Sequence, residues 1–265
     1  MKTKTIIVTG ASSGIGFDIA KALHEDGHTV IGCSRTYPKT DYLWDHKICD
    51  VEKEASVMAF YKSFIHDYTH IDGIIHSAGM GIGGALEDTS YHKALKLHQI
   101  NVLGPFLLTQ IFLPLLREST QAKIINIGSV AGDITLPFQV FYSMSKSSLS
   151  RLTEGLRYEL KPFGIDVSII NPGDTKTNFT TNRQVESNAS SLYKDRVKRS
   201  IDKMAEDELK GKPTQSVVNV VRKQLKRRKM KPAVTVGFSY KCFILLNKIL
   251  PTKLKEHMIY KRYGK

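Results

Sequence analysis

The sequence predicts an α/β protein with a doubly wound, seven-stranded parallel sheet and helices on both faces. Short β-branched runs alternate along the chain with segments whose apolar residues recur at helical spacing. The helical segments are long, and long helical connections join parallel strands by right-handed crossovers. Each β-branched run is apolar almost throughout, as expected for a strand that is covered on both faces.

The expected elements follow from these patterns in chain order. The expected strands cover residues 5–10, 28–35, 47–51, 71–79, 122–129, 164–173 and 232–237. The expected helices cover residues 14–27, 52–67, 91–118, 139–162 and 214–228. The first helix closes on a glycine, which commonly terminates helices. The polar stretch 178–212 is too long for a bare loop, so it predicts a partly helical lid. No linker rich in proline or glycine interrupts the chain, so residues 1–265 are expected to form one domain.

Composition and cysteine usage are those of a globular cytosolic protein. Of the 265 residues, 41% are hydrophobic and 24% are charged, which suits a protein with a buried core. Cys33, Cys49 and Cys242 show no metal or redox spacing, which favours reduced thiols. No His/Cys cluster has metal-ligand spacing, so no metal site is predicted. The sequence lacks a signal peptide pattern and a run long enough for a transmembrane helix, so we expect a cytoplasmic protein.

The net charge of +14 is concentrated near the C-terminus. Residues 222–265 contain 14 of the 39 Lys and Arg residues and one acidic residue, Glu256. The tail 238–265 mixes cations with apolar residues, and a basic amphipathic segment can contact an anionic membrane. Alternatively, the tail packs on its own domain or on another subunit. The cations of 222–231 are not interleaved with aromatic residues, so no nucleic-acid partner is predicted.

The glycine-rich stretch "TGASSGIG" lies between the first strand and the first helix. Glycine permits a tight turn and a close approach of backbone to phosphate, and the helix N-terminus supplies N–H groups and a positive dipole end. This placement predicts a dinucleotide-binding loop, and the alternative is a glycine-rich turn without a ligand. The expected cofactor contacts here are Gly10, Ser12, Ser13, Gly14, Ile15 and Gly16.

The end of the second strand distinguishes NAD from NADP. An acidic residue there would accept hydrogen bonds from the ribose of NAD, but this chain has Ser34 and Arg35. A guanidinium can pair with a 2′-phosphate, so the pair predicts NADP(H). The alternative is that Arg35 is one more exposed cation. After the third strand, Asp50 could accept a hydrogen bond from the adenine amino group, act as the N-cap of the helix 52–67, or do both.

Four polar residues are expected at the carboxyl ends of the strands, where open α/β sheets bind ligands. Tyr142 and Lys146 stand four positions apart, one turn of the helix 139–162. Ser129 ends the fifth strand, and Asn101 lies in the long helix before that strand. Alternatively, the Tyr–Lys pair marks a half-buried helix face, while the serine and asparagine bond only local backbone.

With these residues the chain resembles the short-chain dehydrogenases/reductases. The motifs are "TGASSGIG", "CDV", "HSAG", "NVLG", "GS", "YSMSK" and "NPGDTKT", in family order over about residues 5–175, with a weaker likeness near 214–237. The resemblance implies a Rossmann fold, a homodimer or homotetramer, and a catalytic tetrad of Asn101, Ser129, Tyr142 and Lys146. The further cofactor contacts that it implies are Val51, Ala78, Gly79, Asn101, Tyr142, Lys146, Pro172, Gly173, Thr175 and Thr177. The chain departs from the family at Ser77, where the family usually has asparagine.

The tetrad suits hydride transfer between nicotinamide and a carbonyl or secondary alcohol. A free tyrosine has a pKa of about 10. The ammonium of Lys146 is expected to lower the pKa of Tyr142, so that the phenol can serve as acid and base near neutral pH. Ser129 is expected to bind the substrate oxygen. The resemblance implies that Lys146 also holds the nicotinamide ribose, and that Asn101 holds a water that relays protons to Lys146.

Apolar residues beside the motifs predict a pocket for a bulky apolar carbonyl or alcohol, although several of them could instead fill the core. They are Met80, Ile134, Phe138, Phe141, Met144 and Phe179. The tail resembles C-terminal extensions of family members that act on steroids and retinoids. We therefore expect an NADPH-preferring carbonyl reductase or alcohol dehydrogenase that acts on a hydroxysteroid or another lipid-like substrate. The alternatives are a 3-oxoacyl reductase of fatty-acid type and a non-catalytic NADPH-binding regulator, which would need no Tyr–Lys pair.

Overall fold

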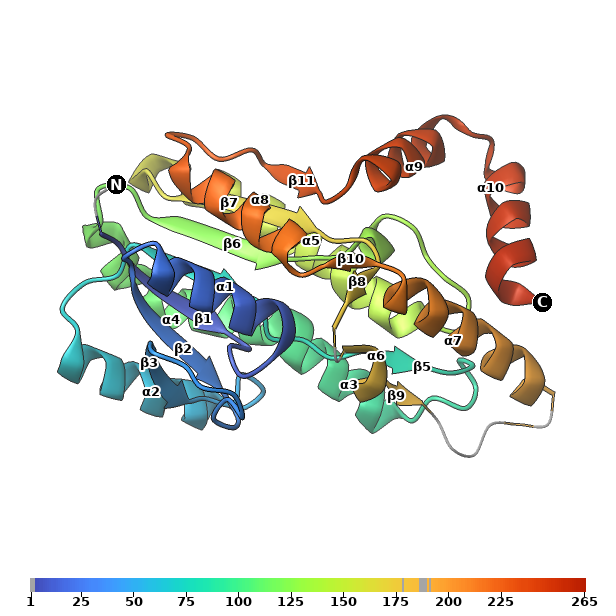
Figure 1. Cartoon of the computed structure of the whole chain (residues 1–265), viewed down its shortest axis with the longest axis horizontal. Coiled ribbons are helices and arrows are strands. Elements are labelled where there is room, and N and C mark those ends of the chain that lie inside the picture. Colours follow the sequence, from blue (N-terminus) through green and yellow to red (C-terminus); the bar gives the residue numbers. More distant parts are fainter. Residues whose placement is uncertain (1–2, 178, 186–189, 191) are drawn as a thin grey trace.

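A seven-stranded sheet runs through the structure, and all of its neighbouring strands pair in parallel. The computed structural model describes residues 3–177, 179–185, 190 and 192–265. The strand order is β11-β7-β6-β4-β1-β2-β3 (Figure 1). The strands are β1 (Thr5–Thr9), β2 (Thr29–Ser34), β3 (Asp45–Ile48), β4 (Gly73–His76), β6 (Lys123–Ile127), β7 (Asp166–Asn171) and β11 (Ala233–Thr235). The expected parallel sheet is confirmed, although β3 begins and ends earlier than the predicted 47–51.

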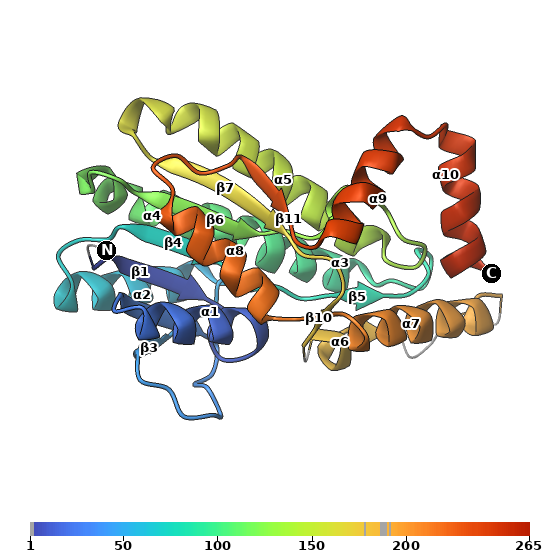
Figure 2. The ribbon, with the colours of Figure 1, turned by 45° about the horizontal axis from the view of Figure 1, so that its top comes forward.

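Helices cover both faces of this sheet, as the sequence predicts (Figure 2). They are α1 (Gly14–Glu25), α2 (Glu54–Asp67), α3 (Tyr91–His98), α4 (Gly104–Glu118), α5 (Val140–Glu159), α6 (Phe179–Asn182), α7 (Lys194–Leu209), α8 (Gln215–Lys226), α9 (Phe238–Ile249) and α10 (Thr252–Ile259). Gly27, with a φ of +82°, follows the end of α1, so the predicted glycine stop is confirmed. The helix expected over 91–118 is α3 and α4 joined by a π-helical turn, η1 (Gln99–Leu103).

The segment Tyr91–Glu118 is the one part of the described chain that is long and apolar enough to cross a membrane by length and composition. Its side chains Leu108, Phe112 and Leu116 are fully buried and pack in the core beside the sheet. In this fold the segment therefore serves as a core helix.

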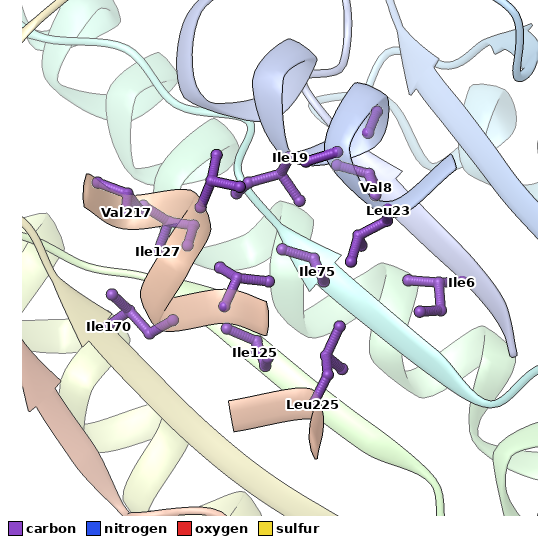
Figure 3. Packing of buried hydrophobic residues seen from close by; sticks show 14 of the residues in the cluster. Ile6, Val8, Ile19, Leu23, Ile75, Ile125, Ile127, Ile170, Val217 and Leu225 are labelled. Carbon is purple, nitrogen blue, oxygen red and sulfur yellow. The ribbon is translucent and has the colours of Figure 1, made fainter. Parts of the chain in front are cut away.

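Two apolar cores flank the sheet, and β1 contributes to both because successive side chains of a strand point to opposite faces. Ile6 and Val8 pack on one face with Leu23 of α1 and Leu225 of α8 (Figure 3). Ile7 packs on the other face, in the cluster that contains the buried side chains of α2 and α4. The two cores hold the carboxyl ends of the strands in place, and the polar loops of the site follow directly from these ends.

The expected lid over 178–212 is partly helical, because it contains α6 and α7. Residues 178, 186–189 and 191 of this prediction lie outside the described residues. Two short parallel bridges tie the lid to the loops after β4 and β7. They pair β5 (Ile82–Gly83) with β9 (Gln184–Val185), and β8 (Thr175–Lys176) with β10 (Lys212–Pro213). The tail after β11 forms α9, α10 and a π-helical turn, η4 (Tyr260–Gly264), which contacts α7.

Candidate active site

A cavity of about 1260 Å³ opens at the carboxyl ends of β1, β2, β4, β6 and β7. Its wall includes the predicted tetrad except Asn101, and all the other residues predicted to contact the cofactor. From the predicted set, the wall contains Gly10, Ser12, Ser13, Gly14, Ile15, Gly16, Ser34, Arg35, Asp50, Val51, Ala78, Gly79, Ser129, Tyr142, Lys146, Pro172, Gly173, Thr175 and Thr177. The fold thus brings together, in one cavity, residues that are far apart in the sequence.

The glycine loop has the shape that a pyrophosphate requires. Gly10 has a φ of +69°, and a Cβ added there would lie 2.8 Å from the backbone of Ala78. A Cβ added at Gly16 would lie 2.4 Å from the carbonyl oxygen of Gly10. The first turn of α1 carries no acidic residue, so nothing offsets the positive end of its dipole. A cradle of bare backbone at a helix N-terminus in the cavity wall fits the phosphates of a dinucleotide.

The end of β2 offers one free cation. Arg35 is exposed, and among the residues that the structure describes it makes no ion pair or hydrogen bond through its guanidinium. The hydroxyl of Ser34 is already engaged, since it donates to Thr36 O at 2.7 Å and lies 2.8 Å from Nε2 of His46. A negatively charged group at this end of the cavity would therefore meet Arg35 rather than the hydroxyl of Ser34.

Asp50 lies in the cavity wall, but it does not cap α2. The helix begins at Glu54, and its N-cap position is Lys53. The carboxylate of Asp50 instead accepts a hydrogen bond from the backbone N–H of Glu52 at 3.3 Å, within the turn that precedes the helix. The predicted capping role is therefore wrong, because the chain makes an extra turn before α2 starts, while the predicted contact with adenine stays a prediction.

Tyr142, Lys146 and Ser129 lie together in the wall of the cavity. Tyr142 and Lys146 stand one turn apart on α5, and the Lys146 ammonium lies 5.8 Å from the centre of the Tyr142 ring. Lys146 Nζ donates to Ile127 O at 2.9 Å, which holds the ammonium at the end of β6. The hydroxyl of Ser129 accepts from the Ala131 N–H at 3.1 Å and is hydrogen-bonded to Tyr142.

Burial dominates the ionisation of this pair. Burial raises the pKa of Tyr142 to about 12, although the hydrogen bond with Ser129 lowers it; the nearby Glu208 raises it further and Arg183 lowers it. Burial also lowers the pKa of Lys146 to about 8. The expected lowering of the tyrosine pKa by Lys146 is not found in this structure, because the cost of placing a phenolate among buried groups is larger.

Asn101 lies beneath the cavity rather than in its wall. Its side chain is 1% exposed and sits in the π-helical turn η1, a kind of turn that is frequent at functional sites. Its amide nitrogen donates to Met80 O and to Ser145 Oγ, both at 3.0 Å, and its amide oxygen accepts from Met80 N at 2.9 Å. Asn101 therefore joins the loop after β4 to α5, and the expected water relay stays a prediction.

The predicted substrate wall is partly wrong. Met80, Ile134 and Phe179 line the cavity, and the Phe179 ring lies 5.5 Å from the ring of Tyr142. The other three, Phe138, Phe141 and Met144, are not in its wall. Phe141 and Met144 stand one and two positions from Tyr142 on α5, so they face other directions than the catalytic edge. Phe138 instead packs under the guanidinium of Arg196, 5.6 Å away.

Much of the remaining wall comes from the tail, and sequence reasoning missed it. Helix α9 and its C-cap, Leu250, contribute Ser239, Tyr240, Phe243, Leu246, Asn247 and Leu250. The segment after them contributes Lys255, Met258, Ile259, Arg262 and Tyr263. Both sets recur at three and four residues, which is one face of each helix. This spacing is visible in the sequence, where it was assigned to a membrane-contacting face or a packing face rather than to the cavity. Within the described residues, no group of three or more His, Cys, Asp or Glu side chains is placed to hold a metal ion.

Comparisons with known proteins agree with this geometry. The family model described as short chain dehydrogenase matches residues 4–188. A 3-ketodihydrosphingosine reductase of Bacteroides thetaiotaomicron is 35% identical over 213 residues, which are 80% of this chain and 79% of that protein. The uncharacterized oxidoreductase YusZ of Bacillus subtilis is 36% identical over 191 residues, 68% of either chain. A crystal structure of a short-chain dehydrogenase from Streptomyces avermitilis has a TM-score of 0.80 and 27% identity, over 98% of this chain and 97% of that one. The chain therefore belongs to the short-chain dehydrogenase/reductase family, whose members are oxidoreductases that use a nicotinamide cofactor.

Proposed function

We propose that this protein is an NADPH-preferring reductase of an apolar, lipid-like ketone, with Tyr142 as the acid–base residue. One observation carries the proposal: Tyr142, Lys146 and Ser129 share a single cavity with the glycine cradle at the N-terminus of α1. A regulator that only bound the cofactor would need the cradle but not the tyrosine, lysine and serine in the same cavity wall.

Each residue has a separate task in this proposal. The bound cofactor supplies the hydride to the carbonyl carbon of the substrate. The Tyr142 hydroxyl donates the proton that the carbonyl oxygen gains, and Ser129 donates a hydrogen bond to the same oxygen as negative charge develops on it. Lys146, held by Ile127 O at 2.9 Å one turn from Tyr142, would hold the ribose of the nicotinamide. Asn101 holds the loop after β4 against α5 and so fixes the position of this part of the cavity wall.

The preference for NADPH rests on Arg35. This guanidinium is exposed at the end of β2 beside the cavity, and no acidic residue there would repel a 2′-phosphate. Asp50 and Val51, which follow β3 in the same wall, would contact the adenine, while Thr175 and Thr177 would contact the nicotinamide side. The assignment follows from charge, because a carboxylate in place of Arg35 would favour the free ribose hydroxyl of NAD.

The substrate class rests on the apolar wall and on one relative. Met80, Ile134 and Phe179 line the cavity, the Phe179 ring lies 5.5 Å from that of Tyr142, and the tail adds further apolar side chains. The Bacteroides relative is named for a keto compound of the sphingoid-lipid class, which is a substrate of this apolar kind. These two observations favour a lipid-like ketone over a small polar one.

The outer face of α9 supports a peripheral membrane contact for a cytoplasmic enzyme. Leu245 and Ile249 are 59% and 70% exposed, and Lys241 and Lys248 are exposed on the same helix. Apolar side chains flanked by lysines favour an anionic bilayer surface. The exposed apolar side chains of Leu103 in η1 and Phe106 on α4 favour a homo-oligomer.

The test is the loss of NADPH absorbance with a panel of ketones, run beside Tyr142→Phe. The panel holds a long-chain aliphatic ketone, a steroid ketone, retinal, an aromatic ketone and a 3-oxoacyl thioester. We expect NADPH-dependent turnover of an apolar ketone, its loss in Tyr142→Phe, and unchanged NADPH binding in that variant. Turnover retained in Tyr142→Phe would refute the assigned role. Tight NADPH binding with no turnover across the panel would favour the regulator instead, and turnover of the thioester alone would favour the acyl reductase.

A further inference from the structure

The C-terminal arch, defined here as α9, α10 and η4, has one continuous face turned to the cavity. On α9 and its C-cap this face contains Phe243, Leu246 and Leu250, and on α10 it contains Met258 and Ile259. Phe243, Leu246 and Met258 are 40%, 49% and 48% exposed, although they line a cavity. These side chains line the cavity, so a ligand that enters it would remove them from water.

The arch is fastened to the body of the molecule at three places. At its start, the Tyr240 hydroxyl donates to Asp174 at 2.5 Å, and a Cβ added at Gly173 would fall 2.3 Å from the Tyr240 ring. In its middle, Asn247 donates to Asp133 O at 3.4 Å. At its end, Arg262 donates to Asp207 of α7 at 2.8 Å. These contacts fix the apolar face relative to the catalytic tyrosine.

The charged residues of the same face are already paired. Lys255 donates to Asn247 O at 3.0 Å, and Arg262 and Tyr263 both donate to Asp207. Because these groups are satisfied within the protein, the unpartnered part of the face is its apolar stripe. From Phe243 to Leu250 this stripe runs for two helical turns, a length on the order of 10 Å.

We propose that the arch binds an unbranched alkyl chain of the substrate, laid along the inner faces of α9 and α10 and leading away from Tyr142. This inference rests on the proposed function and narrows its substrate class, from any bulky apolar ketone to a ketone that carries a long chain. A cavity of about 1260 Å³ exceeds the roughly 300–1,000 Å³ of ordinary ligand pockets, so it has room beyond a cofactor. An apolar face that extends along two helices fits an extended chain better than a compact ring system.

Chain length is the quantity to measure. Each methylene that leaves water is expected to raise kcat/KM by up to about fourfold, the equivalent of about 0.8 kcal/mol. The substrates are straight-chain methyl ketones of increasing length, with a steroid ketone and a short aromatic ketone for comparison. The variants are Leu246→Trp, which places a larger side chain on the cavity face of α9, and Leu245→Trp, which makes the same change on the outer face of the same helix. Leu245 is 59% exposed and is not part of the cavity wall.

We expect kcat/KM to rise with chain length in the wild type and in Leu245→Trp. In Leu246→Trp the rise should stop at short chains, whereas Leu245→Trp should turn over the short aromatic ketone as the wild type does. A flat length profile in the wild type, with turnover of short ketones intact, would overturn the inference and leave the proposed function standing. Equal loss in both tryptophan variants would also overturn it, because the effect would not come from the cavity face.

A binding measurement separates this inference from the proposed function. A fluorescent dansyl-labelled fatty acid is displaced from the enzyme by straight-chain alcohols of increasing length, with no turnover required. Displacement that strengthens with length in the wild type and in Leu245→Trp, but not in Leu246→Trp, would support the alkyl site even if no ketone is reduced. Absence of length-dependent displacement in the wild type would overturn it, whatever the ketone panel shows.

Discussion

Gly16→Ala tests whether the backbone cradle at the start of α1 is as tight as the structure shows. Inside a helix, replacing glycine by alanine favours folding by about 0.8–1.0 kcal/mol. At Gly16 the new Cβ would lie 2.4 Å from the carbonyl oxygen of Gly10 and 2.8 Å from its carbonyl carbon. Backbone atoms cannot rotate away as a side chain can, and Gly10 is itself held against Ala78. The start of α1 must therefore move away from the turn after β1.

The matched control is Gly155→Ala, the same change in α5. A Cβ at Gly155 meets nothing within 4 Å, so this variant should gain the helix-propensity term of up to about 1 kcal/mol. At Gly16, overpacking costs of about 1–3 kcal/mol oppose that gain. We expect Gly16→Ala to be less stable than Gly155→Ala by about 1–3 kcal/mol. The midpoint of thermal unfolding should differ by about 2–4 °C for each kcal/mol.

The affinity for NADPH should distinguish Gly16→Ala from Gly155→Ala more clearly than their stability does. The displaced N–H groups of α1 are those that would hold the pyrophosphate, so the Kd for NADPH should rise at least about tenfold in Gly16→Ala, or 1.4 kcal/mol. Gly155→Ala should bind NADPH as the wild type does. Unfolding can be followed by the single tryptophan, Trp44, whose ring packs 5.0 Å from that of Phe17 on α1. Wild-type NADPH affinity in a folded Gly16→Ala protein would refute the proposal that the glycine loop binds the pyrophosphate.

Three further predictions concern charge. Arg35→Asp should lower the ratio of kcat/KM for NADPH over NADH at least about tenfold, and an unchanged ratio would remove Arg35 from cofactor selection. Burial lowers the pKa of Lys146 from 10.5 to about 8 in the folded state. Between pH 8 and pH 10.5 the unfolded chain therefore binds more protons than the folded protein, so the free energy of unfolding should rise with pH over this range. Lys146→Met should lessen that rise in urea denaturation series, and an identical slope in both proteins would contradict the burial of the ammonium. Ile249→Asp should abolish sedimentation with anionic vesicles while turnover of a short soluble ketone is unchanged; full sedimentation of the variant would place the contact elsewhere.

The cofactor half of the site could be predicted from sequence because its signals are local. The glycines of the first turn, the residue at the end of β2 and the Tyr–Lys spacing on α5 each depend on one element and its neighbour. Parallel strands bring such ends to one edge of the sheet, so the positions of Gly10, Arg35 and Tyr142 in one wall follow from the topology.

The substrate half could not be predicted, because it depends on where distant segments pack. The stripe Phe243, Leu246 and Leu250 has the same spacing whether it faces a membrane, a core or a cavity. Its position depends on contacts with distant residues, among them the pairing of Tyr240 with Asp174 and of Arg262 with Asp207. Phe138 was assigned to the wall by proximity in sequence, yet it has a φ of +61° and lies against Arg196. Such contacts produce no repeating pattern of residues in the sequence.

The sheet topology also orders the assembly of the site during synthesis. The cradle after β1, the proposed adenine contacts after β3 and the proposed catalytic residues of α5 all precede residue 150, whereas the arch follows residue 237. At roughly 5–20 residues per second, the ribosome adds the arch about 5–25 s after Lys146. Until α8 and β11 emerge, β7 remains an open edge and its side chain Ile170 lacks the cover of α8. The part of the cavity wall that the arch supplies is therefore the last to form.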